Sequence, residues 1–296
     1  MMFSGSIVAL TTPMDVHGEI DVAQLGRLVE FHLEAGTEAF VIAGTTGESA
    51  TLSRDEHVQL IESVCELVDG QVPVIAGTGS NSTVQTLDLS RAVDRLSVSG
   101  FLIVTPYYNK PTQEGMYRHF SVVADAVERP VILYNVPGRT GVDLHPDTVE
   151  RLAPHGNITA IKEATGELDR VATLRKGCGS EFSLLSGDDA TACKFMLEGG
   201  NGVISVTANV APAKMRALCD SACSGEQVQA EYIDGQLSAL HQALFTESNP
   251  IPVKWAVQQL GFAGAGIRLP LTVLSKEHHN TVRAAMAAAG VEIVTQ

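Results

Sequence analysis

The sequence has no long apolar run, no excess of positive charge and no paired-cysteine motif. Its first apolar run, residues 7–10, is short and follows no basic segment, so a secretory signal is not indicated. No stretch is long and apolar enough to span a bilayer as a helix. The chain carries 20 lysines and arginines against 34 aspartates and glutamates, a net charge of −14 that argues against nucleic acid and anionic membranes as partners.

Metal and disulfide patterns are also missing. The five cysteines are odd in number and irregularly spaced, which predicts free thiols in a reducing, cytoplasmic compartment. The nine histidines show no metal-ligand spacing, and no glycine fingerprint for a dinucleotide follows the first apolar run. We therefore predict a soluble cytoplasmic protein without a metal site.

Eight short apolar runs alternate with helical patterns through the first two-thirds of the chain. The runs lie at residues 7–10, 40–43, 74–76, 101–104, 131–134, 158–161, 183–185 and 202–206. Continuous apolar runs indicate strands buried on both faces, as in parallel sheets. Eight strand–helix units in 296 residues predict an α/β fold of the (β/α)8 TIM-barrel class. An open doubly wound sheet is the alternative, and it leaves the count of eight without a reason.

Helices are predicted between and after these strands. The patterns that indicate them lie at residues 21–35, 54–68, 83–96, 114–127, 190–197, 212–224, 226–245, 252–260 and 271–289. Ser53 with Glu56 three residues on predicts a capping box at one helix start. The alternation with strands stops after residue 206, so we predict a barrel over residues 1–224 and a C-terminal helical extension over residues 225–296.

Lys162 follows directly on the apolar run 158–161. Burial disfavours the ammonium form and favours a neutral amine, which can attack a ketone and form a Schiff base. The alternative is a lysine that reaches solvent or pairs with Glu163. By itself Lys162 favours that alternative.

The other strand ends reverse this preference. In a TIM barrel the carboxyl ends of all strands meet at one rim, where catalytic residues gather. An amine, a phenol, threonine hydroxyls and a guanidinium therefore converge, from Lys162, Tyr134, Thr45, Thr46 and Arg139. The amine suits a ketone, the phenol can relay protons, and the hydroxyls and guanidinium suit two carboxylates. This set predicts a lyase or aldolase acting on a 2-oxo acid.

These motifs resemble a known family. The segments at residues 44–48, 134–141 and 249–254, with Lys162 between the last two, are similar to those of 4-hydroxy-tetrahydrodipicolinate synthases, formerly called dihydrodipicolinate synthases. That family belongs to the pyruvate-dependent class I aldolases, together with N-acetylneuraminate lyase. The resemblance runs nearly end to end, and the segment around Arg139 is its narrower marker for the synthase.

The resemblance implies a catalytic set and two substrates. Lys162 would form the imine with pyruvate, so no separate cofactor is expected. Tyr134 and Thr45 would relay protons, with Tyr108 reaching across a tight dimer interface as the third member. The second substrate would be L-aspartate 4-semialdehyde, the reaction would begin lysine and diaminopimelate biosynthesis, and the assembly would be a homotetramer built as a dimer of tight dimers.

The resemblance also implies residues that bind substrate and effector. Thr46 would hold the pyruvate carboxylate, Arg139 the semialdehyde carboxylate, and Gly187 and Ile204 would line the pocket. A site for the feedback inhibitor lysine would comprise Ser49, Ala50, Arg54, His57, Asn81, Gln85 and Tyr107. Lysine-sensitive members carry histidine at the position of Arg54 and glutamate at that of Gln85. An added cation and a lost carboxylate both oppose lysine binding, so we predict weak or absent inhibition.

Two alternatives to the synthase remain. One is a related aldolase acting on a sialic acid or a 2-keto-3-deoxy sugar acid, which Arg139 disfavours. The other is a catalytically silent barrel that senses a 2-oxo acid, which the intact pair of Lys162 and Tyr134 disfavours.

Overall fold

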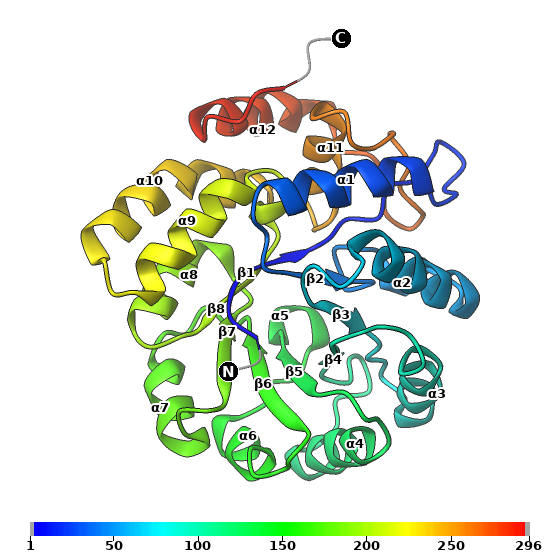
Figure 1. Ribbon diagram of the computed structural model, residues 1–296, viewed down its shortest axis with the longest axis vertical. Coiled ribbons are helices and arrows are strands. Elements are labelled where there is room, and N and C mark those ends of the chain that lie inside the picture. Colours follow the sequence, from blue (N-terminus) through cyan, green and yellow to red (C-terminus); the bar gives the residue numbers. More distant parts are fainter. Residues whose placement is uncertain (1–2, 294–296) are drawn as a thin grey trace.

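Eight parallel strands close into a barrel. The computed structural model describes residues 3–293, and Figure 1 shows the strands at the centre of a ring of helices. The strands are β1 (Gly5–Ala9), β2 (Ala39–Ile42), β3 (Val74–Gly77), β4 (Gly100–Val104), β5 (Val131–Asn135), β6 (Ile158–Glu163), β7 (Ser183–Ser186) and β8 (Gly202–Ser205). Each strand pairs with the next, and β8 pairs with β1. The predicted (β/α)8 barrel is confirmed.

Helices follow the strands and cover the outside of the barrel. They are α1 (Val22–Glu34), α2 (Arg54–Val68), α3 (Thr83–Val93), α4 (Gln113–Asp125), α5 (Pro137–Thr140), α6 (Pro146–Leu152), α7 (Asp169–Cys178), α8 (Asp189–Leu197) and α9 (Pro212–Cys223), with short 3-10 turns η1 (Ser49–Thr51) and η2 (Thr207–Asn209). The capping box predicted at the start of α2 is present, because Ser53 and Glu56 each accept a hydrogen bond from the other's backbone N–H.

Three helices form the C-terminal extension: α10 (Gln227–Ala243), α11 (Ile251–Gln259) and α12 (Lys276–Ala288). Helix α10 packs against α8, α9 and α12, and α11 packs against η2 and α12. The prediction of a helix over residues 271–289 is wrong at its start. Ser275 has extended backbone angles and its N–H donates to the Glu247 carboxylate at 3.3 Å, so α12 begins only at Lys276. The domain boundary at residue 224 stays a prediction.

Side chains alternate between the barrel interior and the helix-covered face. Ile132, Leu185 and Ile204 belong to a compact inner core, whereas Phe40 and Ile103 pack outward against the helices. This two-residue period follows from the pleat of each strand. The inner core fills the barrel, and a cavity remains at the carboxyl ends of the strands, as the fold class predicts.

Candidate active site

A cavity of about 610 Å³, including its opening to solvent, lies at the carboxyl ends of the strands. Six of the residues predicted to act at the site line it: Thr45, Thr46, Tyr134, Arg139, Lys162 and Gly187. They come from four segments that are far apart in sequence, at the ends of β2, β5, β6 and β7, so the barrel brings them to one place. The cavity is also lined by Asp188, Val206, Phe245 and Asn249, which were not predicted as site residues.

Lys162 is the buried amine of this cavity. It is 6% exposed and lies inside β6, which runs two residues further than the predicted apolar run 158–161, to Glu163. Its Nζ lies 4.4 Å from the centre of the Tyr134 ring, and it forms no ion pair with any carboxylate between residues 3 and 293. The pKa of Lys162 is lowered to about 8, mainly by burial; the nearby charge of Asp189 partly opposes this shift and that of Arg139 adds to it.

Glu163 is not the partner of Lys162. Consecutive residues of a strand point to opposite faces, so Glu163 leaves the barrel interior. Its carboxylate accepts hydrogen bonds from Asn135 Nδ2 at 3.2 Å and the Thr165 N–H at 2.9 Å, and it lies 3.6 Å from Arg170 Nη1. The alternative in which Lys162 pairs with Glu163 is therefore wrong.

Gly187 makes room for the lysine side chain. A Cβ at this position would lie 3.0 Å from Lys162 Cε and 2.6 Å from the Ala164 Cβ. Any larger residue at the end of β7 would therefore displace Lys162. Glycine is needed here because of close approach, since its backbone angles are ordinary.

Tyr134 stands next to Lys162 in the paired strands β5 and β6. Burial raises the pKa of the Tyr134 phenol, while Arg139 and a hydrogen bond with the Thr45 side chain act in the opposite direction. The phenol is therefore protonated at neutral pH and can donate a proton within the cavity.

Tyr108 lies outside the cavity. Its side chain is 88% exposed, and its backbone has a φ of 74°, a left-handed conformation that is uncommon for a residue with a Cβ. The Tyr108 N–H donates to the Thr140 carbonyl at 3.2 Å, which holds this conformation next to α5. Tyr108 is thus exposed to solvent and is not among the residues that line the cavity of its own chain.

Asn249 joins two of the predicted binding residues. Its side-chain Nδ2 donates to Thr46 Oγ1 at 3.0 Å, and its backbone carbonyl accepts from Arg139 Nη2 at 3.3 Å. Asn249 follows α10, more than 200 residues from Thr46 in the chain. The residue lies in a segment used for the family resemblance, but strand-end reasoning could not place it because it is not at a strand end.

Ile204 is buried in the inner core, and the cavity is lined instead by Val206. Its predicted contact with substrate stays a prediction. Behind this strand end, the buried Asp189 carboxylate accepts hydrogen bonds from the N–H groups of Val206 and Thr207, each at 2.9 Å. Asp189 therefore fixes the backbone on one side of the cavity.

The residues of the predicted effector site lie outside this cavity, around η1 and the starts of α2 and α3. Arg54 pairs with Asp88, with 2.6 Å between Nε and Oδ2, so the added positive charge has a carboxylate partner. Gln85 accepts from Ser80 Oγ at 2.9 Å. His57 is buried and bonds the Gly77 carbonyl at 2.7 Å, and burial lowers its pKa.

The remaining effector residues are exposed or half-buried. Asn81 accepts at its carbonyl from Asn109 Nδ2 at 2.8 Å, Tyr107 is 39% exposed, and Ser49 and Ala50 form part of η1. Their role as an effector site stays a prediction.

Comparison with known proteins decides the family. The model of the dihydrodipicolinate synthetase family matches residues 2–289. The chain belongs to this family. It is 56% identical over 292 residues to the 4-hydroxy-tetrahydrodipicolinate synthase of Thioalkalivibrio sulfidiphilus, covering 99% of each chain. It is 57% identical to that of Methylococcus capsulatus, covering 98% of this chain and 100% of the relative.

A solved structure agrees. The dihydrodipicolinate synthase of Acinetobacter baumannii, crystallised with pyruvate, superposes with a TM-score of 0.96 at 48% identity, covering 98% of this chain and 99% of that one. The predicted family, its lyase class and its 4-hydroxy-tetrahydrodipicolinate synthase activity are confirmed. The three relatives carry the name of the synthase, which favours it over the sugar-acid aldolase and the sensor.

Within residues 3–293, no helix is long and apolar enough to cross a membrane. The same part of the chain holds no cluster of three or more histidine, cysteine, aspartate or glutamate side chains placed to bind a metal ion.

Proposed function

We propose that this chain joins pyruvate to L-aspartate 4-semialdehyde through an imine at Lys162, and that no separate cofactor takes part. The observation that carries this proposal is the buried amine of Lys162, which has a pKa lowered to about 8 and no carboxylate partner among residues 3–293. At pH 7 about a tenth of such amines are neutral, against fewer than about one in a thousand for an ordinary lysine. Imine formation should therefore accelerate as the pH rises toward 8.

The first half of the reaction builds a nucleophile. The neutral amine of Lys162 attacks the ketone carbon of pyruvate, and the carbinolamine loses water to give the imine. The Tyr134 phenol donates and recovers protons in these steps, with Thr45 sharing its hydrogen bond. The protonated imine then draws electrons from the neighbouring methyl group, which loses a proton and becomes the enamine carbon.

The second half forms the carbon–carbon bond and the ring. The enamine carbon attacks the aldehyde of the semialdehyde, and the resulting oxyanion takes a proton. The amino group of the same substrate then attacks the imine carbon and displaces the Lys162 amine. The products are 4-hydroxy-tetrahydrodipicolinate and free enzyme.

Two carboxylate subsites support this choice of substrates. Thr46 is the proposed hydroxyl donor to the pyruvate carboxylate, and Arg139 the proposed partner of the semialdehyde carboxylate. Gly187 leaves the space that the lysine and its adduct need, and Ile204 is proposed to border the same space. A sialic acid or keto-deoxy sugar acid presents neutral hydroxyl groups in place of this carboxylate, and these accept weaker hydrogen bonds from the guanidinium than a carboxylate does.

The homotetramer remains part of the proposal. Tyr108 is 88% exposed, has a left-handed backbone conformation and lies next to the catalytic rim. Its exposure is explained if it completes the active site of a second copy. We further propose a cytoplasmic enzyme, because all five cysteines are free thiols.

A coupled assay tests the function. Purified protein receives pyruvate with L-aspartate 4-semialdehyde, and in parallel N-acetylneuraminate or a 2-keto-3-deoxy sugar acid. We expect turnover with the semialdehyde and at least about a hundredfold lower kcat/KM with the sugar acids, the cost of two lost charge-assisted hydrogen bonds. Faster cleavage of a sugar acid would favour the aldolase alternative, and pyruvate binding with no turnover would favour the sensor.

A further inference from the structure

The Asn249 side chain makes a single hydrogen bond inside the active-site cavity. Asn249 is 5% exposed and lines the cavity, and its Nδ2 donates to Thr46 Oγ1 at 3.0 Å. Among residues 3–293 its Oδ1 has no hydrogen-bond partner. The Asn249 amide is therefore tied to Thr46 alone.

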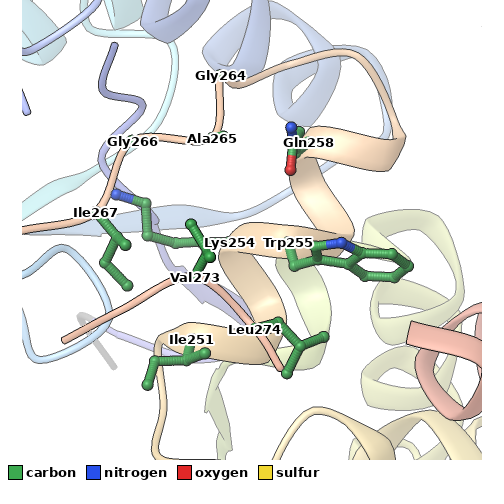
Figure 2. A pocket seen from close by; sticks show the side chains of 10 residues that line it. All are labelled: Ile251, Lys254, Trp255, Gln258, Gly264, Ala265, Gly266, Ile267, Val273 and Leu274. Atoms are coloured by element: carbon green, nitrogen blue, oxygen red, sulfur yellow. The ribbon is translucent and has the colours of Figure 1, made fainter. Parts of the chain in front are cut away.

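The backbone around this hydrogen bond is held by a second link. Lys254, one turn into α11, forms a buried ion pair with Glu48, two residues after Thr46. The other oxygen of Glu48 accepts from the Arg268 N–H at 3.0 Å. Figure 2 shows the Lys254 side chain extending from α11 toward the loop segment at Gly266 and Ile267. The Thr46 loop and the start of α11 are thus fastened together at two points.

A threonine hydroxyl has one proton to donate and lone pairs to accept with. When Asn249 Nδ2 donates to Thr46 Oγ1, the Thr46 proton is left free to point elsewhere. A carboxylate has no proton and can only accept. The Thr46 hydroxyl can then donate its proton to a bound carboxylate, because Asn249 Nδ2 is itself a donor and cannot accept that proton.

We propose that Asn249 is a positioning residue that directs the Thr46 hydroxyl proton toward the carboxylate of the 2-oxo acid. The inference rests on the proposed function, because that function places the pyruvate carboxylate at Thr46. Asn249 lies in the C-terminal extension, so a residue outside the barrel rim would help to select a carboxylate substrate. The Glu48–Lys254 pair keeps the two segments in register, and Asn249 sets the direction of the hydroxyl.

Two side-chain variants separate this role from a structural one. Asn249→Ala removes the donor and lets the Thr46 hydroxyl rotate. Asn249→Asp keeps the shape but can only accept, so it takes the Thr46 proton away from the substrate and adds a repelling charge. Both variants keep the backbone carbonyl that Arg139 contacts.

We expect Asn249→Ala to raise the half-saturating pyruvate concentration about twofold to tenfold, the range of one lost hydrogen bond, and Asn249→Asp to raise it further. The KM for the semialdehyde should change less than about twofold in Asn249→Ala. Half-saturation is measured in steady-state assays and, independently, from the pyruvate dependence of borohydride trapping. Equal rises in both Michaelis constants, or a smaller effect of Asn249→Asp than of Asn249→Ala, would overturn the inference.

A double variant supplies the control. In Thr46→Val the hydroxyl is absent, so adding Asn249→Ala should change pyruvate half-saturation little. Additive effects would mean that Asn249 acts without Thr46 and would overturn the inference. If pyruvate and borohydride do not label the unsubstituted chain, the proposed function fails and this inference with it. Labelling with unchanged half-saturation in Asn249→Ala defeats the inference alone.

Discussion

Two buried lysines differ in their partners. Lys162 is 6% exposed and Lys254 is 5% exposed, and burial is the largest cause of the lowered pKa in both. Lys254 forms an ion pair with the buried carboxylate of Glu48. Lys162 instead faces the Tyr134 ring, with only the more distant charge of Asp189 opposing its loss of a proton.

The difference teaches that burial alone does not make a lysine reactive. An ion pair favours the ammonium form, which has no lone pair and cannot attack a carbonyl. Lys254 therefore serves to fasten α11 to the Thr46 loop. Lys162 has no such partner in the described part of the chain, so part of its population is the neutral nucleophile at physiological pH. Five predictions test this contrast and the roles of the residues around it.

Replacing the unpaired lysine should abolish catalysis. Lys162→Ala removes the nucleophile, and no other lysine between residues 3 and 293 lines the cavity. We expect kcat to fall by about 10⁴-fold or more. Thermal unfolding should stay close to that of the unsubstituted chain, because within residues 3–293 no carboxylate loses an ion-pair partner when the amine is removed. A coupled assay measures turnover, and residual activity above about 1% would assign the chemistry to another group.

Removing the neighbouring phenol should slow the reaction without unfolding the protein. Tyr134→Phe keeps the ring beside Lys162 and deletes only the hydroxyl that bonds Thr45. General acid–base help is worth about 10²–10⁴-fold, and we expect kcat to fall within that span. Thr45→Val is the matched control on the same hydrogen bond and should lower kcat in the same direction. A near-normal kcat in Tyr134→Phe would reduce the tyrosine to packing.

Replacing the paired lysine should damage stability more than chemistry. Lys254→Met leaves the Glu48 carboxylate buried without its cation, which typically costs about 3–5 kcal/mol of unfolding free energy. Denaturant unfolding measures this loss, and pyruvate with borohydride should still label Lys162. The double variant Glu48→Gln with Lys254→Met should recover part of the stability. Normal stability in the single variant would show that the pair contributes nothing.

Removing the guanidinium at the rim should separate the two substrates. Arg139→Ala should raise the KM of aspartate semialdehyde about tenfold to a hundredfold, because a charge-assisted carboxylate contact is lost. Pyruvate KM should change far less, since its carboxylate is proposed to sit at Thr46. Michaelis constants for both substrates decide this, and equal rises would give Arg139 a structural role.

The smallest effect is expected outside the cavity. L-Lysine should inhibit weakly or not at all, because Gln85 is neutral and the nearby Asp88 carboxylate is already held by Arg54. One missing charge-assisted hydrogen bond lowers affinity about tenfold to a hundredfold. Gln85→Glu restores a carboxylate and should make the enzyme more sensitive in a lysine titration. Half-inhibition of the unsubstituted chain below about 1 mM contradicts the argument.

The barrel and most of its rim follow from local sequence patterns. Each strand is a short apolar run, and the fold brings all strand ends together, so Lys162, Tyr134 and Arg139 could be placed from strand order alone. The short helix α6 and the polar helix α7 were not predicted, because neither carries a long apolar stripe. The predicted start of the last helix, at residue 271, was wrong because the Ser275 N–H donates to the Glu247 carboxylate and Ser275 keeps an extended backbone.

The parts of the site that depend on long-range contacts could not be predicted from the pattern. Asn249 reaches the cavity only because the chain after α10 folds back over the barrel rim. The pairing of Lys254 with Glu48 likewise joins residues about 200 positions apart. Nothing in the local sequence distinguishes a lysine that finds such a partner from one that does not.

The most direct test of this contrast is to map the lysine that pyruvate modifies. The protein is incubated with pyruvate, reduced with borohydride and digested, and the peptides are analysed by mass spectrometry. We predict one adduct, on Lys162, with a labelling rate that rises between pH 6 and 8 as the amine loses its proton. An adduct on Lys254, or none on Lys162, would contradict the claim that the missing ion pair selects the reactive lysine.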